Sequence, residues 1–144
     1  GKLVVCGGGA LNDHLMRRFD SDGMIGRVEA IDLASRKTLW VQRRRAPQIS
    51  AILGTAGGLL FEGSRDRWFR ASDQRTGKVL WQTQLNASPG SYPVTYSVDG
   101  VQYVAVVTGG GGSLEGTLGA ALAPEIPGAA SGTTLWVFRL PAGK

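Results

Sequence analysis

Residues 30–40 read AIDLASRKTLW, and a related segment, ASDQRTGKVLW, returns at residues 71–81. Alanine, aspartate, lysine, leucine and tryptophan occupy equivalent places in the two copies, with a constant offset of 41 residues. A repeat of about 40 residues built from short strand-like segments is typical of propeller blades, in which four-stranded sheets stack radially around an axis. The repeat therefore predicts an all-β fold, a β-propeller.

Each copy has the chemistry of a strand, a tight turn and a second strand. Asp32 and Asp73 can accept hydrogen bonds from backbone N–H groups two residues further on, and Gly77 accepts a positive φ. The indoles of Trp40 and Trp81 are large enough to fill the gap between neighbouring sheets, where each indole N–H needs a partner. We therefore expect the repeated tryptophan to pack between blades.

Strand-like segments divide the chain into groups of three, four and three strands. The predicted strands are residues 3–6, 27–31 and 38–42; 49–53, 59–62, 68–71 and 79–84; and 94–98, 101–107 and 135–140. Between the strands at 94–98 and 101–107, Asp99-Gly100 predicts a two-residue type I′ hairpin turn. The corresponding blades are approximately residues 1–45, 46–88 and 89–141.

Two connections between strands are longer than the repeat requires. Leu3 and Leu59, in the second strands of their blades, are 56 residues apart, so the first blade carries about 15 extra residues before its third strand. The third blade has a Gly- and Ala-rich insertion at about residues 109–133 in the equivalent connection. Equivalent connections emerge on one face of a propeller, and long loops on a rigid scaffold usually form the binding face. We expect the ligand on that face.

Length and cysteine content narrow the interpretation. A chain of 144 residues holds about three such blades, whereas closed propellers have at least four, so we expect the C-terminal fragment of a larger propeller. The single cysteine, Cys6, excludes an internal disulfide and a Cys-x-x-Cys-His haem attachment. No apolar run is long enough for a membrane span.

The formal net charge is +5, and residues 43–45 form the densest basic run. The run lacks the interleaved aromatic residues of a nucleic-acid site and follows a predicted strand, so we expect no nucleic-acid partner. A solvated loop is the favoured interpretation. Contact with an anionic ligand is the alternative.

The individual candidate residues form no complete catalytic or metal set. His14 lies beside Asp13, but no second partner at ligand spacing accompanies it, which favours an exposed loop histidine. Residues 109–112 are four glycines, yet the Gly-Lys-Ser/Thr of a phosphate loop does not follow them. Glycines at this place would allow the backbone to approach a flat ligand closely.

The pattern Ala-x-Asp-x-x-Thr-Gly-Lys-x-x-Trp at residues 71–81 resembles the tryptophan-docking motif of the pyrroloquinoline quinone (PQQ) dependent alcohol dehydrogenases. Residues 55–63, 92–96, 99–106 and 135–141 are similar, in order and spacing, to the last blades of the eight-bladed propeller of that family. The resemblance covers nearly the whole chain.

The resemblance implies an exported enzyme, periplasmic or secreted. Such enzymes bind PQQ with Ca²⁺ or a lanthanide and oxidise a small alcohol or sugar by hydride transfer to the quinone, aided by an aspartate base. An electron acceptor such as a cytochrome c or a quinone and the rest of the parent propeller would be the partners. The catalytic aspartate and the metal ligands of the family lie in earlier blades, so the resemblance implies none in this chain.

The resemblance also implies which residues would line the cofactor site. The expected pocket wall consists of Gln48, Ile49 and the backbone of Gly110, Gly111 and Gly112. Two aromatic side chains of the family correspond to positions near Ile49 and at Ser113, and neither position is aromatic here. The substrate and the orientation of the cofactor are therefore left open.

A non-catalytic propeller with the same repeat, like the outer-membrane assembly lipoprotein, is the alternative. Its blades would serve as a protein-binding scaffold. The long resemblance over residues 55–106 favours the dehydrogenase, because a scaffold would need only the tryptophan repeat.

Overall fold

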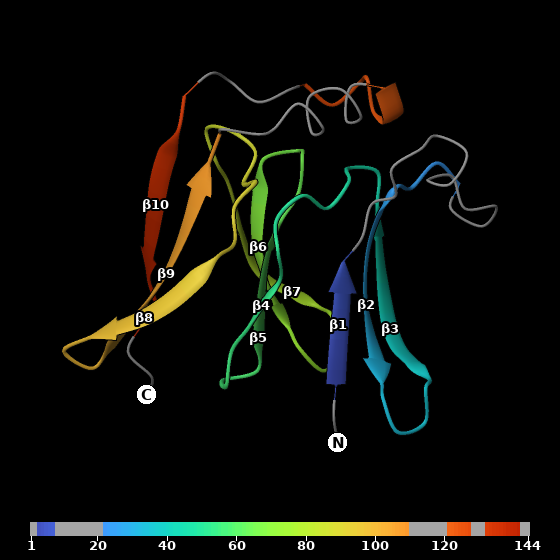
Figure 1. The fold of residues 1–144 in the computed structure, drawn as a ribbon, viewed down its shortest axis with the longest axis horizontal. Helices are drawn as coiled ribbons and strands as arrows, with labels where there is room; N and C mark the ends of the chain where they lie inside the picture. Colours follow the sequence, from blue (N-terminus) through green and yellow to red (C-terminus); the bar gives the residue numbers. More distant parts are fainter. Residues whose placement is uncertain (1–2, 8–21, 110–120, 128–131, 142–144) are drawn as a thin grey trace.

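The computed structural model describes residues 3–7, 22–109, 121–127 and 132–141, and its strands form three antiparallel sheets (Figure 1). The first sheet contains β1 (Leu3–Gly7), β2 (Gly26–Asp32) and β3 (Thr38–Arg44). The second contains β4 (Leu53–Gly54), β5 (Leu59–Gly63), β6 (Trp68–Asp73) and β7 (Val79–Gln84). The third contains β8 (Val94–Val98), β9 (Val101–Thr108) and β10 (Thr134–Arg139). The all-β fold and the predicted grouping of strands are confirmed.

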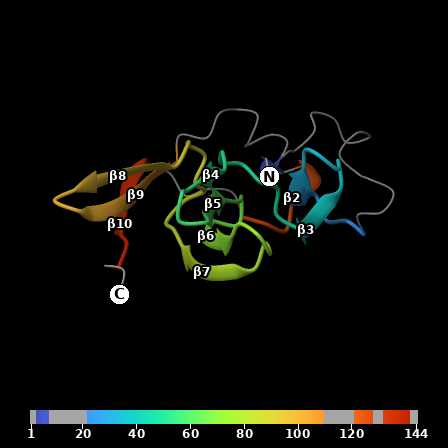
Figure 2. The same ribbon diagram turned by 90° about the horizontal axis from the view of Figure 1, so that it is seen from below.

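The three sheets stand side by side, with the four-stranded sheet in the middle (Figure 2). Within each sheet, strands that are adjacent in sequence pair with one another, as short connections favour. The contacts between sheets therefore come from strands and turns of neighbouring repeats.

The repeated segment forms the same turn in the first and second sheets. Oδ1 of Asp73 accepts hydrogen bonds from the backbone N–H groups of Arg75 (3.0 Å) and Thr76 (2.8 Å) and from the Thr76 hydroxyl (2.8 Å). Asp32 accepts the two equivalent backbone bonds in the first sheet. The aspartate thus accepts hydrogen bonds from the N–H groups of the turn, which lies outside both strands.

Trp40 joins the first sheet to the turn of the second. Its Nε1 donates a hydrogen bond to the carbonyl of Gln74 (3.1 Å), and its ring lies against Gly77, where an added Cβ would stand 2.6 Å from a ring carbon. The side chain of Gln42, two residues along β3, donates to the carbonyl of Gly77. The expectation that the tryptophan packs between sheets and finds a partner for its N–H is confirmed for Trp40.

The second and third sheets meet through apolar side chains. Phe69 stacks on Phe61 and on Phe138, with ring centroids 6.0 and 5.7 Å apart, and Trp81 packs edge-on against Phe138 at 5.2 Å. The buried residues of this cluster are Phe61, Phe69, Ala71, Leu85, Val104 and Val106. Burial of apolar area holds this interface together.

Besides the Trp40 contact, the first and second sheets meet through buried polar groups around Arg44 and Glu62, here called the polar seam. Arg44 of β3 donates to Oε1 of Glu62, a residue that is only 2% exposed. Arg70 lies opposite Glu62 in the β5–β6 register and donates to Ser64 and Asp66. The same sheet thus presents an apolar face to one neighbour and a charged face to the other.

The predicted strand at residues 49–53 is largely wrong, because a side chain takes the place of the strand ladder there. The Ser50 hydroxyl accepts from the N–H of Gly63 (2.6 Å) and donates to the carbonyl of Ala51 (2.8 Å). The backbone N–H groups of Ile49 and Ser50 both point to the Gly63 carbonyl. Regular pairing therefore begins only at β4.

The hairpin between β8 and β9 has the predicted turn. Asp99 and Gly100 have φ values of 50° and 75°, and Val98 pairs directly with Val101. Positive φ at both central residues is the signature of a type I′ turn.

We expect a Gly77→Ala substitution to destabilise the protein more than Gly100→Ala does. The two glycines have nearly equal φ values, 72° and 75°, but an added Cβ meets the Trp40 ring at Gly77 and open space at Gly100. Both variants therefore carry the cost of placing alanine at a positive φ. Only the Gly77 variant carries the additional overpacking cost of about 1–3 kcal/mol. Thermal unfolding of the two variants measures the difference, which should vanish in a Trp40→Ala background. Equal destabilisation by both variants would contradict the docking role of Gly77.

We expect the stabilising effect of Asp73 to fall on acidification. Its pKa is lowered from the ordinary aspartate value, first by the Thr76 hydroxyl and then by the Thr76 and Arg75 N–H groups. A lowered pKa means that the stabilisation is present above the ordinary value and is lost as the pH falls through the folded-state pKa. The difference in melting temperature between the wild type and Asp73→Asn should therefore shrink in acid. A difference that is constant with pH would refute this explanation.

Candidate functional site

The region called here the loop-bearing end is the end of the sheets at which Pro47, Arg65, Ser88 and Gly109 lie. In Figure 1, β1 and β9 run toward the same end of the molecule. Arg65, just after β5, donates its N–H to the carbonyl of Pro47 (3.0 Å), and its own carbonyl accepts from the Ser88 hydroxyl (2.9 Å). Gly109, just after β9, donates its N–H to the carbonyl of Ser88 (3.1 Å). Hydrogen bonds thus join the second and third sheets at this end.

The two long connections both reach the loop-bearing end. Arg45 donates from Nη1 to the carbonyl of Gly23 (3.0 Å), which lies in the connection between β1 and β2. It donates from Nη2 to the carbonyl of Leu122 (2.7 Å), which lies in the connection between β9 and β10. The prediction that both insertions emerge on one face is confirmed for their described residues, which lie at the upper end in Figure 1.

The structure describes two of the five residues expected in the cofactor site. Gln48 forms an isolated bridge with Ser64 at the loop-bearing end, and Ile49 beside it is half-buried. Gly110, Gly111 and Gly112 lie outside the described residues, as do Ser113, His14 and Asp13. Gly109, which immediately precedes the three glycines, is joined to the Gln48 segment through Ser88 and Arg65.

The side-chain amide of Gln48 has a defined orientation. Its Nε2 lies 3.2 Å from the carbonyl and 3.3 Å from the hydroxyl of Ser50. Because that hydroxyl gives its own proton to the Ala51 carbonyl, it can only accept from Gln48, so the NH₂ group must face it. The Oε1 atom is then a buried acceptor without a hydrogen-bond partner in the described part of the chain. It is suited to a ligand that brings an N–H or O–H donor.

The interpretation of residues 43–45 as a solvated loop is wrong. The first two arginines belong to β3, and the Arg44 guanidinium is engaged by Glu62 and by the side-chain oxygen of Gln42. Arg45 forms an ion pair with Glu125. The pKa of Glu125 is lowered, first by its own backbone N–H and then by Arg45. The Glu62 in an otherwise apolar strand is the sequence signal that would have indicated a buried partner for the arginine run.

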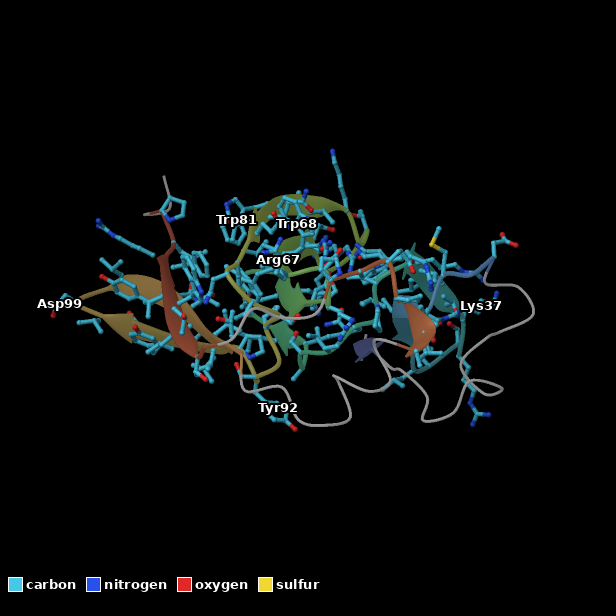
Figure 3. The ribbon with its side chains drawn as sticks, turned by 90° about the horizontal axis from the view of Figure 1, so that it is seen from above. Lys37, Arg67, Trp68, Trp81, Tyr92 and Asp99 are labelled. Atoms are coloured by element: carbon cyan, nitrogen blue, oxygen red, sulfur yellow. The ribbon has the colours of Figure 1, made fainter. Side chains whose placement is uncertain are left out.

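Tyr92 is an exposed aromatic residue near the end of β9 that sequence reasoning did not single out. Its side chain is 79% exposed and projects away from the ribbon in Figure 3. The neighbouring Ser91 hydroxyl accepts from the N–H of Val107 (2.8 Å), which places Tyr92 close to the end of β9. The sequence alone does not distinguish an exposed tyrosine here from a buried one.

The described residues contain no group of three His, Cys, Asp or Glu side chains placed to hold a metal ion. Among the same residues, no helix is long and apolar enough to cross a membrane.

Comparisons with known proteins agree with this geometry. Residues 21–104 match the family model described as "Glucose/ethanol/alcohol dehydrogenase, beta-propeller domain". The chain is 36% identical over 121 residues to a quinoprotein ethanol dehydrogenase of Pseudomonas aeruginosa, which covers 84% of this chain and 19% of that protein. It is 38% identical over 120 residues to a 1-butanol dehydrogenase (quinone) of Thauera butanivorans, which covers 83% of this chain and 19% of that protein.

Among solved structures, a europium-containing methanol dehydrogenase is similar to the chain with a TM-score of 0.70 and 34% identity. The similarity covers 83% of this chain and 24% of that one. The chain therefore spans about a fifth of the length of the two curated relatives.

We expect Arg44→Met to be strongly destabilising and a second change at Glu62 to recover much of the loss. The side chains of Arg44 and Glu62 are 18% and 2% exposed, so the single variant leaves a buried carboxylate without its partner, at a cost of about 3–5 kcal/mol. Arg44→Met with Glu62→Leu removes both charges and should lie much closer to the wild type. Urea unfolding measures the free energy of unfolding of the wild type, the single variant and the double variant. Lys37→Met, in the exposed turn, is the control. A double variant as unstable as the single one would contradict the pairing.

Proposed function

This chain belongs to the family of glucose, ethanol and alcohol dehydrogenase β-propeller domains, and we propose that the protein of which it is part oxidises an alcohol or sugar by hydride transfer to PQQ. The observation that carries the proposal is the identity of 36% over 84% of the chain with a quinoprotein ethanol dehydrogenase. The likeness to a europium-containing methanol dehydrogenase supports a lanthanide as the accompanying ion, and Ca²⁺ is the alternative that we propose.

The described residues match this cofactor only in part. No described group of carboxylates, histidines or cysteines is placed to hold the metal ion, so we propose that its ligands and the catalytic aspartate come from other parts of the propeller. PQQ carries three carboxylates and a pyrrole N–H. The unpartnered Oε1 of Gln48 suits that N–H, or an alcohol hydroxyl, and does not suit a carboxylate.

The contribution of this chain is then to shape one side of the site. We assign Gln48 and Ile49 to the wall, together with the backbone of Gly110, Gly111 and Gly112. The hydroxyl of Ser50 holds the Gln48 amide in place, so the acceptor is fixed before a ligand arrives. PQQ supplies the hydride-accepting chemistry when bound, and the protein orients the reactants around it.

Oxidation of an alcohol by PQQ requires an electron acceptor, and the acceptor bears on where the protein is located. We propose that electrons pass to a quinone, as the name of the 1-butanol relative indicates for that protein, or to a cytochrome c. A periplasmic or secreted location fits such an acceptor. The rest of the parent propeller completes the site.

Reconstitution of the full-length parent protein with PQQ and either Ca²⁺ or a lanthanide tests the proposal. We expect dye reduction with a panel of alcohols or sugars that depends on both the quinone and the metal. Gln48→Leu should weaken equilibrium binding of PQQ or raise the KM for the alcohol, whereas Gln102→Leu, in the exposed β8–β9 hairpin, should change neither. A full-length protein that binds no PQQ would refute the proposal and favour the scaffold alternative.

A further inference from the structure

The guanidinium of Arg45 contacts both long connections at once. Its Nε and Nη2 form a two-pronged ion pair with the Glu125 carboxylate, in which Nη2 lies 3.1 Å from Oε2. The remaining contacts are those from Nη2 to the Leu122 carbonyl and from Nη1 to the Gly23 carbonyl. One side chain therefore links a residue 22 positions before it in the sequence to a residue 77 positions after it.

The connection between β9 and β10 is attached to the body of the protein at more than this point. It leaves the third sheet at Gly109, whose φ of 77° and close approach to the Gly132 carbonyl bring its beginning and its end together. Leu122 is 4% exposed and Ala123 is fully buried. Residues 121–127 of a connection that starts and ends at the third sheet thus lie at Arg45, which directly follows β3 of the first sheet.

Only an arginine can make this set of contacts. Its planar guanidinium presents five donors in a fixed fork, so it can grip a carboxylate with one edge and reach carbonyls with the rest. A lysine has three donors on a single nitrogen and cannot span three acceptors on two segments. The geometry is therefore specific, although the side chains of Arg45 and Glu125 are 38% and 52% exposed.

We propose that Arg45 is a positioning residue that fixes residues 22–25 and 121–127, the parts of the two long connections that it reaches, relative to each other at the loop-bearing end and so shapes the substrate entrance. The inference rests on the proposed function for its catalytic consequence. Its structural part, the tie between residues 22–25 and 121–127, stands on the contacts themselves. Arg45 touches neither substrate nor cofactor in this proposal.

The test uses the full-length parent protein with the variants Arg45→Ala, Arg45→Lys and Glu125→Gln, and with Lys37→Ala as a control. Lys37 lies in the exposed turn between β2 and β3, and this turn is at the end of the sheets opposite the connections in Figure 1, so the variant removes the same charge at a distance from them. Hydrogen exchange of peptides covering residues 22–25 and 121–127 reports the tie directly. Steady-state kinetics reports KM and kcat separately.

We expect Arg45→Ala to speed exchange in both segments and to raise the KM for the alcohol about two- to tenfold, with kcat nearly unchanged, because the tie consists of partly exposed charge-assisted bonds. Glu125→Gln should show a smaller change of the same kind, and Arg45→Lys should recover only part of the loss. An exchanged pair, Arg45→Glu with Glu125→Arg, should not restore exchange protection, because a carboxylate at position 45 cannot donate to the two carbonyls.

Unchanged exchange in Arg45→Ala would overturn the tie, whatever the activity. Faster exchange with an unchanged KM would overturn the positioning role, as would an equal rise in KM for Lys37→Ala. If the wild-type parent oxidises no alcohol, the proposed function fails, and the exchange measurement still decides whether Arg45 joins the two connections.

Discussion

The contact of Trp40 with the turn at residues 73–77 determines how the first sheet meets the second. The turn does not take these hydrogen bonds from the first sheet, because Asp73 of the same repeat accepts them from the N–H groups of Arg75 and Thr76. Gly77 then serves two purposes: it adopts a positive φ that closes the turn, and it leaves the space that the indole fills. Local turn chemistry and packing between sheets therefore constrain the same residue.

The two interfaces of the middle sheet rely on different physics. Toward the third sheet, stacked phenylalanines and aliphatic side chains exclude water, and stability scales with the apolar area buried. Toward the first sheet, Arg44 and Glu62 lose hydration that their attraction only partly offsets, so the polar seam adds little net stability while it is intact. It strongly disfavours any arrangement in which one charge is buried without the other.

Features set by local sequence were predictable, and features set by distant partners were not. The propeller repeat, the strand grouping and the Asp99-Gly100 turn follow from periodicity and turn chemistry within a few residues. The arginine run was misjudged because Arg44 and Arg45 find their carboxylates 18 and 80 residues away. The strand at 49–53 was overestimated because the Ser50 hydroxyl replaces a ladder bond to β5. Of the candidate site, the sequence located the loop-bearing end but could not specify the orientation of Gln48.

Trp40 and Gly77 are unlike surfaces, so the contact between these sheets has a direction. Repeats joined head to tail in this way keep adding until the rotation per repeat closes a ring. Because the two faces of the middle sheet differ, they also determine which neighbouring sheet packs on each side. If the first and third sheets exchanged places, Glu62 would face phenylalanines and the phenylalanines would face Arg44, and both mismatches cost free energy. The chemistry of the faces thus determines which blade lies next to which. It disfavours incorrect pairing between blades of a repetitive chain.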